Sequence, residues 1–161
     1  MKTSGDSLIT EQMRAQIGKE IKFGPPFEVE KGAIRSLAEA MNFPNPLYLD
    51  EKYAWSKGHS SVVAPPGFAS YDLPLGAPLG VLAFPFEIVS GLHGSDEWEY
   101  FQDIHAGDVL TPRGKIIDLF ERKGKRGRML FVVSEVTFTN QRSEVVAIYR
   151  PTEIFIAGQT K

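Results

Sequence analysis

The sequence predicts an α+β domain in which helices come first and four or five long antiparallel strands follow. Within residues 31–42, apolar side chains recur every three or four positions, which indicates a helix with one apolar stripe. From Phe86 onward the chain is rich in Val, Ile, Phe and Tyr, and apolar side chains occupy most even positions over residues 130–138. Short segments of turn-forming residues separate the expected strands, so consecutive strands are expected to pair as a meander.

The N-terminal segment differs from the rest of the chain. Residues 7–20 have apolar side chains at helical spacing, and Gly18 is placed to end that helix. The segment that follows contains two adjacent prolines, which exclude a helix there. We therefore expect a single domain over residues 1–161, in which residues 1–18 form a helical extension and residues 19–157 form the main fold.

A further short helix is expected to begin at Asp50, a residue type that caps helix N-termini, and to end near Gly58. After it, residues 64–86 combine prolines and glycines with large apolar side chains. Such a stretch is too apolar for bare surface, so it lies against the core, a partner or a ligand. The order of elements suggests a hot-dog fold, in which an antiparallel sheet wraps around one central helix, here residues 31–42.

Composition argues against several classes of function. The formal net charge is -2, whereas nucleic-acid-binding proteins usually carry a strong basic excess. The chain has no cysteine, and therefore no disulfide, thiolate metal site or cysteine nucleophile. Its three histidines are scattered, and no apolar run approaches the roughly 20 residues of a membrane helix. We expect a cytoplasmic protein without a metal site, bound nucleic acid or a membrane span.

Three stretches of the sequence carry a family resemblance through their order and spacing. They are AEAMNFPNPLYLDEKYA, APPGFA, and a longer stretch that contains Leu92-His93-Gly94 and Gly107-Asp108. Together they resemble the MaoC-like hydratase/dehydratase family, and more closely the non-catalytic N-terminal-half type of that family. The resemblance implies a hot-dog fold and a role in adding water to 2-enoyl thioesters or removing it from 3-hydroxyacyl thioesters. It implies no cofactor beyond the CoA or acyl carrier protein that carries the substrate.

The same resemblance locates the positions of the catalytic groups. In catalytic members the loop after the central helix reads Gly-Asp-x-Asn-Pro-x-His-x-Asp, and its Asp and His move protons. Asn45, Pro46 and Asp50 match this pattern, whereas Phe43 stands at the aspartate position and Tyr48 at the histidine position. Phenylalanine cannot titrate, and a tyrosine hydroxyl, with a reference pKa of about 10, is a poor general base. No catalytic dyad is intact, so the loop is expected to build a pocket.

Loss of the dyad is what the resemblance implies for a substrate-binding subunit. In double hot-dog members one half keeps the dyad and the other holds the acyl chain. Subunits of (3R)-hydroxyacyl-carrier-protein dehydratases divide the work in the same way. We therefore expect an acyl thioester as ligand, and a catalytic MaoC-like subunit or a second copy of the chain as partner. The expected substrate-binding residues are Phe43, Asn45, Pro46, Tyr48, Pro66, Gly67 and Phe68.

Several residues keep other interpretations open. Phe43 and Tyr48 could simply pack together as aromatics. A self-sufficient homodimeric hydratase could use His93 with Asp50 as its catalytic pair. In the structural interpretation of the same residues, His93 makes a hydrogen bond and Asp50 caps a helix. An acyl-CoA thioesterase could use Glu39, although that residue falls off the apolar stripe. A non-enzymatic acyl-thioester binding module is the third possibility.

The basic hairpin expected over residues 121–128 also has two interpretations. It could meet an acidic carrier protein or the phosphates of CoA. It could equally be a solvated turn, which charged hairpin tips usually are.

Overall fold

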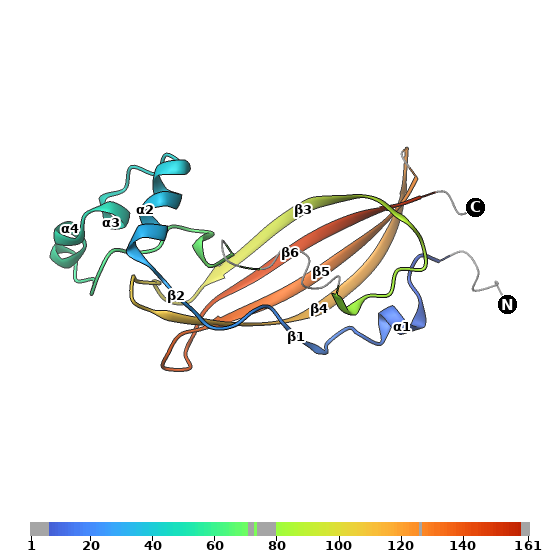
Figure 1. The fold of residues 1–161 in the computed structure, drawn as a ribbon, viewed down its shortest axis with the longest axis horizontal. Coiled ribbons are helices and arrows are strands. Elements are labelled where there is room, and N and C mark those ends of the chain that lie inside the picture. The colour runs from blue at the N-terminus through green and yellow to red at the C-terminus, as the bar shows by residue number, and fades with distance from the viewer. Residues whose placement is uncertain (1–6, 71–72, 74–79, 126, 159–161) are drawn as a thin grey trace.

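The computed structural model describes residues 7–70, 73, 80–125 and 127–158. Its framework is an antiparallel sheet dominated by long strands (Figure 1). The long strands are β3 (Ile88–Tyr100), β4 (Val109–Gly124), β5 (Gly127–Thr139) and β6 (Val145–Ala157). Two short strands, β1 (Glu20–Lys22) and β2 (Phe27–Glu28), pair with β4. The predicted α+β class is therefore confirmed.

The strand order is β1-β4-β5-β6-β3, and all of these pairings are antiparallel. β4, β5 and β6 form a meander through short turns, as predicted. The prediction is wrong for β3, which lies beside β6 and not beside β4, its neighbour in sequence. The connection over residues 101–108 is long enough to carry the chain from β3 past the ends of β6 and β5 to β4. It extends about 3.3 Å per residue, and neighbouring strands are only about 4.8 Å apart.

The helices α2 (Lys31–Ala40), α3 (Pro46–Leu49) and α4 (Glu51–Ser56) gather at the end of the sheet where β3 ends and β4 begins (Figure 1). α2 buries Ile34 and Ala38, as its predicted apolar stripe requires. α4 agrees with the predicted short helix, whereas α3 is an additional turn of helix within the expected loop. Within the described ranges, no helix has the length and apolar character needed to cross a membrane.

The N-terminal helix α1 (Glu11–Arg14) is shorter than the spacing predicts. Beyond it the chain turns toward the sheet, where the Gly18 N–H donates a hydrogen bond to the Ile116 carbonyl oxygen at 2.8 Å. Gly18 has φ +80°, in the left-handed region that favours glycine, so a glycine at this position lets the chain turn without strain. Met13 is fully buried, which means that the expected extension packs into the core of the domain.

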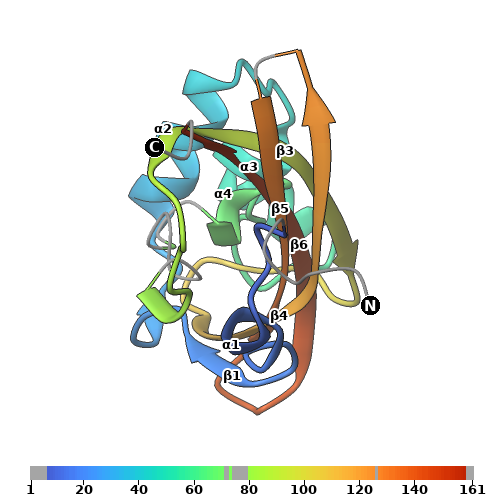
Figure 2. The same ribbon diagram turned by 90° about the vertical axis from the view of Figure 1, so that its right-hand side faces the viewer.

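The core lies against one face of the sheet. Along β5, the even-numbered residues 130–138 are buried, while the odd-numbered residues are half-buried. Met13 from the N-terminal segment and Ile34 from α2 belong to the same apolar cluster. Figure 2 shows α2 and the segment that leads into β3 on the same side of β4, β5 and β6.

Parts of the apolar run over residues 64–86 pack against this face, while others, such as Val81, are exposed. Phe68, in the 3-10 turn η1 (Phe68–Ser70), is buried, and Phe84 contacts Phe155 of β6 with ring centroids 5.3 Å apart. Residues 71–72 and 74–79 of the run lie outside the described residues.

Candidate functional site

The corner between α2 and α4 is shaped by two capping side chains. The Asn45 carboxamide oxygen accepts a hydrogen bond from the Leu47 N–H at 3.0 Å. Pro46 follows in the first turn of the helix, where a backbone N–H would have no partner within the helix, so proline is tolerated. The Asp50 carboxylate accepts a hydrogen bond from the Lys52 N–H at 2.9 Å and so starts α4. The predicted cap at Asp50 is confirmed, and Asn45 forms a second cap one helix earlier.

Residues 62–64 connect this corner to the sheet. The Val63 N–H donates to the Leu47 carbonyl oxygen at 2.9 Å, and the Ala64 N–H donates to the Ile104 carbonyl oxygen at 2.7 Å. The segment is therefore bonded to α3 on one side and to the β3–β4 connection on the other.

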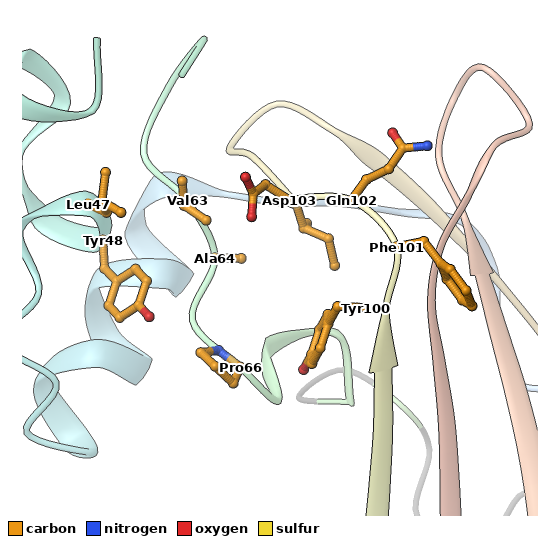
Figure 3. Close-up of a pocket in the computed structure, with 10 residues that line it drawn as sticks. Leu47, Tyr48, Val63, Ala64, Pro66, Tyr100, Phe101, Gln102 and Asp103 are labelled. Atoms are coloured by element: carbon orange, nitrogen blue, oxygen red, sulfur yellow. The ribbon is translucent and has the colours of Figure 1, made fainter. Parts of the chain in front are cut away.

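A cleft of about 410 Å³ opens between α3 and the end of β3 (Figure 3). Most of its lining residues are apolar or aromatic, but two tyrosines, a glutamine and an aspartate help give it a polar surface nearly as large as its apolar one. The lining residues are Leu47, Tyr48, Val63, Ala64, Pro66, Tyr100, Phe101, Gln102, Asp103 and Ile104. Figure 3 shows Tyr48, Pro66 and Tyr100 around the same space. Clefts of this size and character commonly hold small organic ligands.

Tyr100, which lines the cleft, is hydrogen-bonded to the loop before η1. The Gly67 N–H donates a hydrogen bond to the Tyr100 hydroxyl oxygen at 2.7 Å, and Gly67 has φ +84°, where a Cβ would be strained. Burial raises the pKa of Tyr100, and the bond from Gly67 only partly opposes that effect. The hydroxyl therefore stays protonated at neutral pH and does not act as a general base.

The expected substrate-binding residues take different positions around the cleft. Tyr48 and Pro66 line it directly. The Phe43 ring meets the Tyr48 ring edge to face, with centroids 6.4 Å apart. Asn45 and Pro46 build α3 and do not appear in the cleft wall.

The remaining candidates lie elsewhere in the structure. His93 is on β3, where its Nε2 lies 2.9 Å from the Asp96 Oδ1, while Asp50 caps α4. Neither His93 nor Asp50 lines the cleft. Glu39 is exposed on α2, and Phe68 is 2% exposed within the core.

Sequence reasoning missed the cleft residues that come from the end of β3 and the connection after it. Tyr100, Phe101 and Asp103 lie far from the proline loop in sequence, and they reach the cleft because α3 sits over the end of the sheet. The available signal was an aromatic pair at the end of a strand, which is also common in cores.

The chemistry of the cleft favours binding over proton transfer. Among the described lining residues there is one carboxylate, from Asp103, and no histidine. The Asp103 side chain is 62% exposed, and its Oδ2 lies 3.8 Å from the Nδ1 of His59. Hydration of an enoyl thioester needs an acid and a base beside the reacting carbons. The described lining offers apolar surface for an acyl chain, and His59, the histidine beside Asp103, is not part of that lining.

Comparison with known sequences agrees with the family resemblance. The family model of the FAS1-like dehydratase domain region matches residues 15–149. A UPF0336 protein of Thermobifida fusca is 33% identical over 139 residues, which are 84% of this chain and 89% of that protein. A probable enoyl-CoA hydratase alpha subunit of Thermomonospora curvata is 30% identical over 132 residues. That match spans 73% of this chain and 41% of the longer relative.

Comparison with solved structures establishes the fold. The C-terminally truncated HadBC (3R-hydroxyacyl-ACP dehydratase) complex of Mycobacterium tuberculosis gives a TM-score of 0.70 at 21% sequence identity. The match covers 86% of this chain and 96% of the matched chain. The hot-dog fold expected from the sequence is therefore confirmed.

Proposed function

This chain belongs to the family of FAS1-like dehydratase domain regions, and we propose that it is the substrate-binding subunit of a heteromeric (R)-specific enoyl-thioester hydratase or 3-hydroxyacyl-thioester dehydratase. In this proposal the chain holds the acyl group of a CoA or acyl-carrier-protein thioester. A second, MaoC-like subunit provides the Asp/His dyad that adds or removes water.

The aromatic pair at the dyad positions carries this proposal. Phe43 and Tyr48 stand where catalytic members have aspartate and histidine, and the Tyr48 ring lines the cleft. Burying an alkyl chain against such a wall contributes about 25 cal/mol per Å² of apolar surface. The same rings provide no carboxylate or imidazole to activate a water molecule.

The names of the relatives support a subunit role. The hydratase relative is named an alpha subunit, and the HadBC structure is described as a complex. This chain corresponds to 41% of that alpha subunit, so the comparison covers only part of the longer protein.

The edge strand β3 supports association with a second chain. Among the described strands β3 pairs only with β6, which leaves the hydrogen-bonding groups along its other side open to another strand. Val89 and Leu92 on β3 are 65% and 47% exposed. Apolar side chains on a long uncovered edge favour a subunit contact.

The proposal is tested by following hydration of crotonyl-CoA. We expect no turnover by the purified chain and little by a dyad-bearing MaoC-like subunit alone, but steady turnover when the two are mixed. Replacing the dyad histidine of that second subunit should abolish the activity of the mixture, which would locate the chemistry there. Turnover by the lone chain at the rate of the mixture would contradict the proposal.

A further inference from the structure

A second group of polar side chains lies on the core-facing side of the sheet, next to the β3 edge. The Tyr149 hydroxyl donates a hydrogen bond to the Asp96 Oδ1, and the His93 Nε2 lies 2.9 Å from the same oxygen. Glu153 of β6 stands directly opposite His93 in the strand register. We call His93, Asp96, Ser134, Tyr149 and Glu153 the concave cluster.

Two buried atoms of the concave cluster have no hydrogen-bond partner within the described part of the chain. They are the Ser134 Oγ and the Glu153 Oε2. Ser134 is 1% exposed, and it belongs to the row of even-numbered β5 residues that face the core. Leaving such atoms unpaired destabilises a fold by about 1–3 kcal/mol each, so they call for an explanation.

The strand register places these two atoms in the same neighbourhood. Val132 is opposite Glu153 and Val136 is opposite Tyr149, so Ser134 falls between the two polar residues of β6 on the same face. Burial raises the pKa of Glu153, and the charge of His93 opposes that effect.

A row of stacked aromatic rings leads from the cleft to the concave cluster. Tyr100, which lines the cleft, stacks on Trp98 with centroids 5.4 Å apart and planes at 9°. Trp98 in turn stacks on Tyr149 with centroids 4.3 Å apart. The His93 and Asp96 side chains are 53% and 44% exposed. The cluster therefore extends from the surface at β3 to the buried Ser134 Oγ and Glu153 Oε2.

We propose that the concave cluster is a polar subsite for the acyl group, and that it recognises a hydroxyl carried on the chain away from the thioester. The hydroxyl hydrogen is donated to the Glu153 Oε2, and the hydroxyl oxygen accepts from the Ser134 hydroxyl. The aromatic row from Tyr100 to Tyr149 gives the intervening alkyl chain its apolar path. This inference rests on the proposed function, because it requires that the chain binds acyl thioesters.

A hydroxyl suits this pair of atoms better than an unsubstituted chain. It is both donor and acceptor, and it can satisfy the carboxylate and the serine together. An unsubstituted alkyl chain at the same place leaves both atoms unpaired. Sites built to bond a substrate hydroxyl therefore discriminate against the analogue that lacks it.

The test uses matched pairs of acyl-CoA thioesters, with and without a terminal hydroxyl, at octanoyl, dodecanoyl and hexadecanoyl length. Dissociation constants are measured by calorimetry with the full chain, alone and mixed with its dyad-bearing partner. We expect the hydroxylated member to bind about tenfold more tightly at one of these lengths, as one or two hydrogen bonds to buried groups would give. Equal affinity within every pair would overturn the inference.

Two variants of the concave cluster sharpen the test. Ser134→Ala and Glu153→Gln should each reduce or remove the preference for the hydroxylated member of the pair. Thr137→Ala, on the opposite face of β5, is the matched control and should keep the preference. Circular dichroism confirms that each variant is folded. A preference that survives Ser134→Ala would also overturn the inference.

The outcomes separate this inference from the proposed function. If unsubstituted thioesters bind and the hydroxyl adds nothing, only the concave cluster loses its role. If no thioester of either kind binds to the chain or to the mixture, the substrate-binding function fails and the subsite fails with it.

Discussion

Phe43 and Tyr48 meet edge to face across the corner that precedes α4, with ring planes at 60°. Aromatic pairs of this geometry stabilise one another by about 0.5–1.5 kcal/mol beyond the apolar area they bury. Phe43 therefore acts on the cleft by holding Tyr48 in place, and the Tyr48 ring forms part of the cleft wall. The contribution expected from both residues is shape and apolar area.

Two substitutions of Tyr48 distinguish a role of its ring in binding from a role of its hydroxyl in proton transfer. In the mixture with a catalytic subunit, Tyr48→Phe should leave kcat and KM nearly unchanged, because the ring is kept. Tyr48→Ala should raise KM roughly tenfold with little change in kcat, as expected when uniform binding is lost. Steady-state kinetics on an enoyl-CoA series measures both. A fall in kcat of a hundredfold or more in Tyr48→Phe would instead assign proton transfer to the hydroxyl.

Glu153 makes stability depend on pH in a defined direction. Burial raises the pKa of Glu153 above its ordinary value of 4.5, with His93 opposing, so the folded state holds the proton more strongly than the unfolded chain. The group favours folding at pH values below 4.5, and that contribution is lost as pH rises through the folded pKa. Glu153→Gln should therefore raise the melting temperature at about pH 8 and change it little at about pH 3.5.

Thermal melts at the two pH values check this expectation. Glu39→Gln, at an exposed position on α2, is the control and should show no such difference. A gain for Glu153→Gln that is the same at both pH values would mean that burial of the charge is not its cause.

At the scale of elements, the packing of the first strands on β4 depends on one glycine. A Cβ built on Gly114 would collide with the Phe23 ring, whereas one on Gly32 of α2 would meet nothing within 4 Å. Gly114→Ala should therefore destabilise the fold by about 1–3 kcal/mol. Gly32→Ala should stabilise it by about 0.5 kcal/mol, because alanine favours helix. Urea unfolding measures both, and a Gly114→Ala variant as stable as wild type would show that the contact is readily relieved.

The elements that could be predicted from the sequence are those with a local cause. α2 follows from the spacing of residues such as Ile34 and Ala38, and α4 follows from the Asp50 cap. α3 was missed because one turn of helix leaves no periodic pattern, although Asn45-Pro46 is the kind of pair that starts a helix. The edge position of β3 was missed because strand order depends on how a connection crosses the sheet, which no local pattern records.

The candidate site was predictable only in part, for the same reason. The proline loop and Pro66 could be found as continuous stretches, and Tyr48 lies within the first of them. Tyr100 enters the cleft from another element, so its contribution depends on the fold. Ser134 looks like any residue in an alternating strand until the register places it between the positions opposite Glu153 and Tyr149.

At the scale of the whole molecule, the edge of β3 that no described strand covers is the surface proposed to meet a partner. Leu92→Glu, which places a charge on that edge, should weaken association with the catalytic subunit roughly tenfold or more without unfolding the chain. Val145→Glu, on an exposed apolar residue of β6, is the matched control and should associate normally. Sedimentation of the mixed subunits measures both. Undiminished association of Leu92→Glu would place the contact on another surface.

Calorimetric titration of a medium-chain enoyl-CoA into the lone chain, followed by injection of the catalytic subunit, separates binding from chemistry in one cell. We expect a saturable heat of binding with no continuing heat, and then a steady heat of hydration once the second subunit is present. Continuing heat from the lone chain, with hydrated product in the cell, would contradict the division of labour proposed for this protein.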